Sequence, residues 1–205
     1  MRMGKSKQSM YKVGITGGIG SGKSTVCELL ATYGIAIYDS DARAKALMND
    51  NEALREALCE AFGAECYVDG ALNRQYLAAQ VFGSEEKLAQ LNAIVHPAVR
   101  ADFRTWAENQ SGDYVVLESA ILFEAAFDNE VDTTIAVLAP LEERVRRASA
   151  RDGVDRDAIL RRIEHQMNDD ELHARAARCL VNLRREYLES DVEQMHKMLL
   201  YEARR

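Results

Sequence analysis

Residues 17–24 read GGIGSGKS and fill the pattern G-x-x-x-x-G-K-[ST]. Before this stretch, residues 11–16 (YKVGIT) form a short β-prone run, and residues 23–33 (KSTVCELLATY) carry apolar side chains at helical spacing. A strand, a glycine loop and a helix in this order are the context in which the pattern marks a phosphate-binding loop, or P-loop. The alternative is a glycine-rich turn that matches by chance.

The residue types of this loop suit a phosphate ligand. Glycines lack a Cβ, so the backbone N–H groups can turn inward around the β- and γ-phosphates, and the positive end of the next helix faces the same charge. Lys23 adds a mobile cation, and the Ser24 hydroxyl is placed to coordinate Mg²⁺. We therefore predict a site for a nucleoside triphosphate with magnesium. The predicted contacts are Gly18, Ile19, Gly20, Ser21, Gly22, Lys23, Ser24 and Thr25.

Strand-like and helix-like segments alternate in the rest of the chain. Further strands are predicted at residues 35–38 (IAIY), 114–117 (YVVL), 133–138 (TTIAVL) and 179–181. Strands that alternate with helices imply right-handed crossovers and a parallel sheet covered on both faces. The sequence thus predicts an α/β protein with the three-layer P-loop NTPase fold and a parallel five-stranded sheet.

The segment after the second strand has a different pattern. Residues 39–110 contain no strand comparable to the others, and three stretches carry apolar residues at i, i+3 and i+4. We expect a helical insertion here within a single domain, since 205 residues suffice for one α/β core but not for a second independent fold.

Composition limits the class of protein. No segment approaches the roughly 18 apolar residues of a membrane helix, and the net charge of −7 argues against a general nucleic-acid binder. The leader MRMGKSKQSM has no apolar h-region, so we expect a frayed leader and not a secretory signal. The four cysteines form no C-x-x-C pair, which indicates reduced thiols in a cytoplasmic protein.

Acidic residues follow two of the predicted strands. Asp39 and Asp41 lie where a doubly wound sheet presents its strand ends to a ligand, and a carboxylate there can accept a proton from an attacking hydroxyl. Asp39 can equally serve as a helix N-cap. Glu118 ends the run YVVL, where it would either orient a magnesium-bound water or the acceptor, or act as a buried cap.

A run of arginines lies between residues 144 and 162. Acidic residues are mixed into it, which is typical of a solvated helix face, although an arginine on a closing lid would also stabilise a transferred phosphate. The arginines are Arg144, Arg146, Arg147, Arg151, Arg156, Arg161 and Arg162.

Together these motifs resemble the dephospho-coenzyme A kinase family, and the resemblance runs over nearly the whole chain. It rests on residues 14–26 (GITGGIGSGKSTV), Asp39 and Asp41, 94–99 (IVHPAV), 117–125 (LESAILFEA), 146–152 (RRASARD), 161–167 (RRIEHQM) and Asn182. The resemblance implies transfer of the ATP γ-phosphate to the ribose 3′-hydroxyl of dephospho-coenzyme A, which gives coenzyme A and ADP in the last step of coenzyme A biosynthesis.

The resemblance also implies three parts within the domain. We expect a core at about 11–38, 111–150 and 177–205, a helical substrate-binding insertion at about 39–110, and a helical lid at about 151–176. We expect a monomer or weak homo-oligomer with no nucleic-acid or membrane partner.

Individual roles follow from the same resemblance. Asp41 is the expected base, with Lys23 and Arg147 as catalytic cations. The further nucleotide contacts expected are Arg151 and Asn182, the expected substrate contacts are Asp39, Asp41, His96, Glu118 and Leu122, and the other arginines are interpreted as surface charge. Without the resemblance, His96 is better explained as a hydrogen-bonded structural histidine.

Some positions depart from the family pattern. Lys45 stands where the family often has an arginine, Ala120 replaces a proline, and Leu183 and Arg184 replace a small residue and glycine. Two other functions remain open, namely another small-molecule P-loop kinase, acting on a nucleoside monophosphate or a sugar acid, and a nucleotide-dependent switch. The D-x-D after the second strand favours an enzyme.

Overall fold

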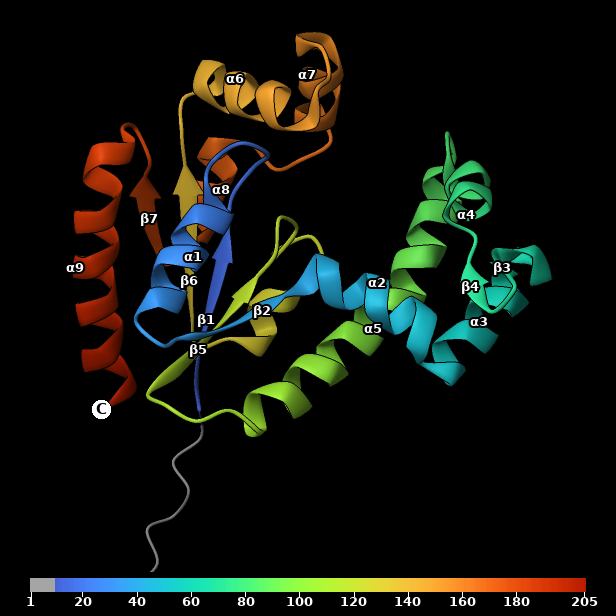
Figure 1. Ribbon diagram of the computed structural model, residues 1–205, viewed down its shortest axis with the longest axis horizontal. Helices are drawn as coiled ribbons and strands as arrows, with labels where there is room; N and C mark the ends of the chain where they lie inside the picture. Colours follow the sequence, from blue (N-terminus) through green and yellow to red (C-terminus); the bar gives the residue numbers. More distant parts are fainter. Residues whose placement is uncertain (1–9) are drawn as a thin grey trace, which may run out of the picture. The chain divides into compact units, whose positions relative to one another are not determined.

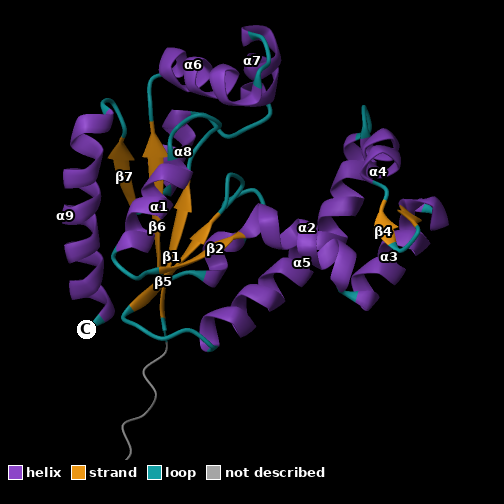
Figure 2. Cartoon of the chain, viewed as in Figure 1, coloured by secondary structure: helices purple, strands orange, loops and turns teal. Residues whose placement is uncertain are grey.

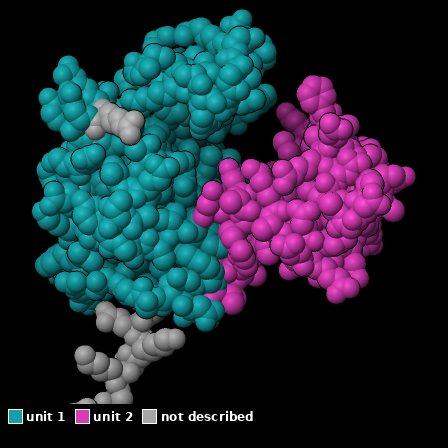
Figure 3. Space-filling view, in the orientation of Figure 1, with its two compact units in different colours: residues 1–38, 106–205 teal, residues 39–105 magenta. Residues whose placement is uncertain are grey.

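The structure is a computed structural model that describes residues 10–205, except for the side chain of Arg185. The first nine residues of the expected leader MRMGKSKQSM lie outside the described residues. Two compact units are present: the core unit contains the chain up to Tyr38 and from Trp106 to Arg205, and the insertion unit contains Asp39–Thr105 (Figure 3).

A five-stranded sheet forms the centre of the core unit (Figures 1 and 2). Its strand order is β2-β5-β1-β6-β7, and β1 pairs in parallel with both β5 and β6, as β6 does with β7. The strands are β1 (Tyr11–Thr16), β2 (Ala36–Asp39), β5 (Tyr114–Glu118), β6 (Thr133–Leu138) and β7 (Arg178–Val181). The predicted parallel five-stranded α/β fold is confirmed, and each strand lies within one residue of its predicted position.

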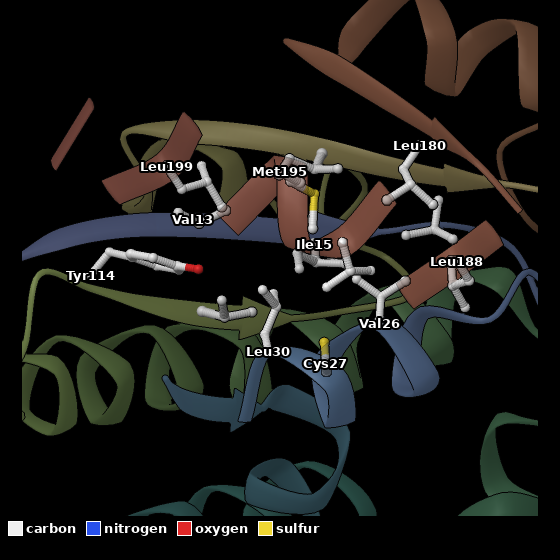
Figure 4. Packing of buried hydrophobic residues seen from close by; sticks show 14 residues of the cluster. Val13, Ile15, Val26, Cys27, Leu30, Tyr114, Leu180, Leu188, Met195 and Leu199 are labelled. Atoms are coloured by element: carbon white, nitrogen blue, oxygen red, sulfur yellow. The ribbon is translucent and has the colours of Figure 1, made fainter. Parts of the chain in front are cut away.

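Helices α1 (Lys23–Thr32) and α9 (Arg185–Ala203) cover one face of this sheet (Figure 4). Val13 and Ile15 of β1 are fully buried against apolar side chains of both helices, which also contact each other. Burial of each such side chain stabilises the fold by roughly 1.5–3 kcal/mol. This core fixes the first turn of α1 at the end of β1, where the predicted P-loop lies.

Three further helices belong to the core unit, namely α6 (Leu141–Asp152), α7 (Arg156–Glu164) and α8 (Asp169–Arg175), along with a 3₁₀ turn at Phe127–Glu130. Helices α6 and α7 pack through Val145, Ala148 and Ile159. None of the helices formed by residues 10–205 is both long and apolar enough to cross a membrane.

The insertion unit is mainly helical. Its helices are α2 (Ser40–Asp50), α3 (Glu52–Phe62), a 3₁₀ turn at Ala64–Cys66, α4 (Arg74–Val81) and α5 (Glu85–Glu108). Helix α5 continues through Pro97, and its end from Trp106 onward is part of the core unit. Side-chain caps start the first three α-helices, because Asp39, Asn51 and Asn73 each accept hydrogen bonds from backbone N–H groups of the first turn.

A small antiparallel hairpin in this unit was not predicted. It consists of β3 (Tyr67–Val68) and β4 (Ala71–Leu72). Asp69 (φ 50°) and Gly70 (φ 81°) form its turn, with both residues in the left-handed region. Asp-Gly is the preferred dipeptide for such a turn, so the signal was present in the sequence.

Candidate active site

Residues 17–22 connect β1 to α1 and form a tight loop. Gly20 (φ 75°) and Gly22 (φ 101°) adopt left-handed backbone, which strains any residue with a Cβ. A Cβ at Gly20 would overlap the carbonyl oxygen of Arg144, and one at Gly22 would overlap the side-chain amide of Asn182. The loop conformation therefore depends on glycine at these positions.

The start of α1 is suited to an anion. Gly22 is its N-cap, and because glycine has no side chain it makes no capping hydrogen bond to the N–H groups of the first turn. Such N–H groups and the helix dipole attract negative charge. A cavity of about 700 Å³ opens here, lined by Lys23, Ser24 and Thr25 of α1 and by Arg146, Arg147 and Arg151 of α6. Cations from two elements thus face the loop.

Ser24 and Glu118 meet beside this loop. The Ser24 hydroxyl donates a hydrogen bond of 2.9 Å to Oε1 of Glu118, which ends β5 next to β1. Because the proton is directed at the carboxylate, the lone pairs of the serine oxygen remain available to a metal ion. Glu118 therefore contacts the predicted magnesium ligand.

Asn182 braces the loop from the other side. It follows β7, and its side-chain amide donates a hydrogen bond of 2.9 Å to the carbonyl of Ser21. The side chain of Asn182 is buried, and neither its Oδ1 nor Oγ of Ser21 has a hydrogen-bond partner among residues 10–205. Asn182 thus lines the cavity and also holds the backbone of the P-loop.

The two arginines singled out from the sequence both line the cavity. Nη2 of Arg147 donates to the carbonyl of Asn182 at 3.4 Å, and its buried Nη1 has no hydrogen-bond partner within the described residues. Arg151 pairs with Asp152 at 2.7 Å and keeps 65% of its side chain exposed. Both arginines can therefore pair with a polyphosphate that enters the cavity.

The interpretation of Arg144 as surface charge is wrong. Only 4% of its side chain is exposed, since it lies on the face of α6 that also buries Val145 and Ala148. It donates from Nε to the carbonyl of Ile19 (3.1 Å) and from Nη1 to Asp169 (2.7 Å). The missed signal is its position four residues before Ala148 on the apolar side of the helix.

Leu122 is fully buried in the core unit. Its side chain lies 3.0 Å from the place that a Cβ on Gly14 would take, so it packs against β1. A fully buried apolar side chain in this position contributes to packing, which does not support the predicted direct contact with a substrate.

The other predicted residues belong to the insertion unit. Asp39 caps α2, since its Oδ1 accepts from the N–H groups of Asp41 (2.9 Å) and Ala42 (3.0 Å). The cap fixes the backbone of Asp41, whose side chain is exposed in the first helical turn. His96 is half-buried in α5, and burial together with the charge of Arg100 lowers its pKa.

These features suit a nucleoside triphosphate: the glycine loop leaves room only for backbone, α1 presents its N-terminus, and lysine and arginine side chains line the cavity. A P-loop between the first strand and helix of a parallel sheet, with arginines of a second helix lining the same cavity, defines a P-loop nucleotide-binding protein. Residues 11–186 match the family described as Dephospho-CoA kinase. The chain belongs to this family.

Individual relatives agree with the assignment. A dephospho-CoA kinase of Salinibacter ruber is 45% identical over 177 residues, which cover 84% of this chain and 89% of the relative. The crystal structure of TT1252 from Thermus thermophilus is 41% identical and superimposes with a TM-score of 0.77, covering 94% of this chain and 97% of the other. A dephospho-CoA kinase structure from Campylobacter jejuni, at 19% identity and a TM-score of 0.61 over 93% and 98% of the two chains, shows the same fold.

Proposed function

We propose that this protein transfers the γ-phosphoryl group of ATP to the ribose 3′-hydroxyl of dephospho-coenzyme A, giving coenzyme A and ADP. The observation that carries the proposal is the glycine cradle at the start of α1, which opens into a cavity lined by lysine and arginine side chains. The identity of the acceptor substrate is inferred from membership of the dephospho-CoA kinase family.

On the nucleotide side, we assign phosphate binding to the P-loop N–H groups and Lys23. Arg147 and Arg151, one turn apart on α6, would stabilise the negative charge of the transferred group. Ser24 would hold Mg²⁺ with Glu118 as its hydrogen-bond partner, and this ion, when bound, neutralises charge on the phosphate oxygens. Asn182 would contact the nucleotide while it braces Ser21.

On the acceptor side, we assign the general base to Asp41. Its carboxylate would take the proton of the 3′-hydroxyl as that oxygen forms a bond to the γ-phosphorus, and the bond to the bridging oxygen of ADP breaks. The exposed side chain and the backbone position fixed by Asp39 support this role. We also assign Asp39, His96 and Glu118 to the acceptor site, in keeping with the family motifs that contain them.

We further propose a cytoplasmic enzyme that acts as a monomer or weak homo-oligomer on a small molecule, without a nucleic-acid partner. The net charge of −7 is unfavourable for a general contact with nucleic acid. Free thiols at Cys27, Cys59, Cys66 and Cys179 agree with a reducing compartment.

The direct test is an assay of the purified protein with ATP, Mg²⁺ and dephospho-coenzyme A. We expect coenzyme A and ADP in equal amounts, and no product from a Lys23→Ala variant. Nucleoside monophosphates and sugar acids serve as alternative acceptors, compared by kcat/KM. Higher kcat/KM with one of these, or ATP hydrolysis that no acceptor accelerates, would refute the proposed activity.

A further inference from the structure

Ile19, at the tip of the P-loop, has both of its backbone polar groups held by side chains from outside the loop. Its N–H donates to Oε1 of Gln166 at 2.8 Å, and its carbonyl accepts from Nε of Arg144 at 3.1 Å. Its side chain packs against the apolar cluster between α6 and α7. The tip is therefore anchored to α6, to α7 and to the segment that follows α7.

Arg144 is the charged member of this anchor. Its guanidinium is almost fully buried, and Nη1 donates to Oδ1 of Asp169 at 2.7 Å. A buried cation is costly unless a carboxylate pairs with it. Asp169 is the first residue of α8, and a capping box formed by Asn168 and Glu171 fixes this helix start. The position of the carboxylate is thus set by the fold.

The P-loop packs directly against Arg144. A Cβ at Gly18 would overlap Nη2 of Arg144, and a Cβ at Gly20 would overlap its backbone carbonyl. Nη2 is buried and has no hydrogen-bond partner among the described residues. Both the side chain and the backbone of Arg144 therefore limit the conformations open to the loop.

We infer that Arg144 is a positioning residue for phosphate binding, with Asp169 as the carboxylate that orients it. The inference rests on the nucleotide-binding part of the function proposed above. Phosphate binds more tightly when the N–H donors already point at its site, because the loop then loses less freedom on binding. Arg147 lies one turn after Arg144 on α6, so the same anchor fixes this cation relative to the loop.

The variant Arg144→Gln tests this role, because glutamine keeps a polar side chain but loses the charge and the fork of donors. Its affinities for ATP, ADP and AMP are measured by titration calorimetry without any acceptor. We expect affinity for ATP and ADP to fall about tenfold, the loss of one charge-assisted hydrogen bond. Affinity for AMP should change less than about twofold, since the loop faces the β- and γ-phosphates. In turnover, KM for ATP should rise while KM for the acceptor stays unchanged.

Two further variants complete the experiment. Arg156→Gln is the control, because it removes another arginine–carboxylate pair between α7 and α6. In this exposed pair Arg156 donates to the two carboxylate oxygens of Glu142 at 2.6 and 2.7 Å. This variant should bind ATP with wild-type affinity. Asp169→Asn should lower the affinity for ATP about threefold. The double variant with Arg144→Gln should bind ATP almost as well as Arg144→Gln alone, because the two residues act as one unit. If Arg144→Gln does not fold, Asp169→Asn alone decides.

Wild-type ATP affinity in a folded Arg144→Gln variant, or in Asp169→Asn, would overturn the inference. An equal loss of affinity for AMP would also overturn the inference, since it would indicate general damage to the cavity. Because the assay needs only nucleotide, a protein that binds ATP in this pattern yet fails to phosphorylate dephospho-coenzyme A would refute the proposed function and leave the role of Arg144 standing.

Discussion

The side-chain oxygen of Ser24 lies 2.9 Å from Oε1 of Glu118 and donates a hydrogen bond to it. This contact joins the first turn of α1 to the last residue of β5, across 94 positions of the chain. A carboxylate that accepts from a metal ligand orients that ligand and raises its basicity. Since we propose Ser24 as the magnesium ligand, this pair is where the proposed dependence on magnesium should be most sensitive to substitution.

Glu118→Gln should lower the apparent affinity for Mg²⁺ by about tenfold, because glutamine can still accept the serine proton but carries no charge. Initial rates measured against free Mg²⁺ at saturating ATP would show the shift, with kcat at saturating Mg²⁺ largely retained. Glu142→Gln, which removes an exposed carboxylate on α6, is the control. A rise in KM for dephospho-coenzyme A with an unchanged magnesium curve would instead assign Glu118 to the acceptor.

Asp41→Asn should reduce kcat by about 10²-fold or more and leave ATP affinity nearly unchanged, because the amide cannot accept a proton from the hydroxyl. Asp50→Asn is the matched control, since this exposed aspartate lies at the other end of α2. Turnover and ATP binding should be measured on the same preparations. Near-normal turnover in Asp41→Asn would remove Asp41 from the mechanism.

Gly20→Ala and Gly34→Ala separate local crowding from backbone strain. Both glycines have positive φ (75° and 81°), so each alanine should cost roughly 1–2 kcal/mol of stability. Only at Gly20 would the new Cβ overlap another group, whereas nothing lies within 4 Å at Gly34. We expect Gly20→Ala to lose ATP binding and Gly34→Ala to keep it. Denaturation curves and ATP titrations would check this, and equal ATP affinity in the two variants would contradict the tight cradle.

The strands could be predicted because each is a short, largely apolar run with a polar, turn-forming or helix-like segment after it, as Gly17 follows YKVGIT. The hairpin with its turn at Asp69 and Gly70 was not predicted, because two-residue strands are too short to show an alternation of apolar and polar residues, even though the turn signal was present. The periodicity of apolar residues therefore predicted the core strands well and the small surface hairpin poorly.

The P-loop residues were predictable because their chemistry is encoded within eight consecutive positions. The contacts around them were not, since Arg144 meets Ile19 across 125 positions. Within the arginine run, Arg144 and Arg146 look alike in sequence, yet α6 buries the first and exposes the second. Which charge is structural is decided by the face of the helix, and that depends on the packing of α6 against the loop.

His196 should make stability depend on pH. Its ring stacks on Tyr33 with centroids 4.6 Å apart, and its Nδ1 lies 2.7 Å from the hydroxyl of Tyr114. Burial lowers the pKa of His196 below its ordinary 6.5, and the charge of Lys197 acts in the same direction, against an opposing effect of Asp113. Just below pH 6.5 the unfolded chain therefore binds more protons at this position than the folded one.

The free energy of unfolding should consequently fall as pH decreases from above the unfolded pKa through the lowered folded value. Urea denaturation at about pH 8 and about pH 5.5 would measure this change in the wild type and in His196→Gln. The variant should lose stability at the higher pH through its missing contacts, but its curve should be flatter, because glutamine does not titrate. Half-buried His96, whose pKa is also lowered, should leave a residual slope in the variant. Identical slopes in the two proteins would show that His196 does not titrate differently on unfolding.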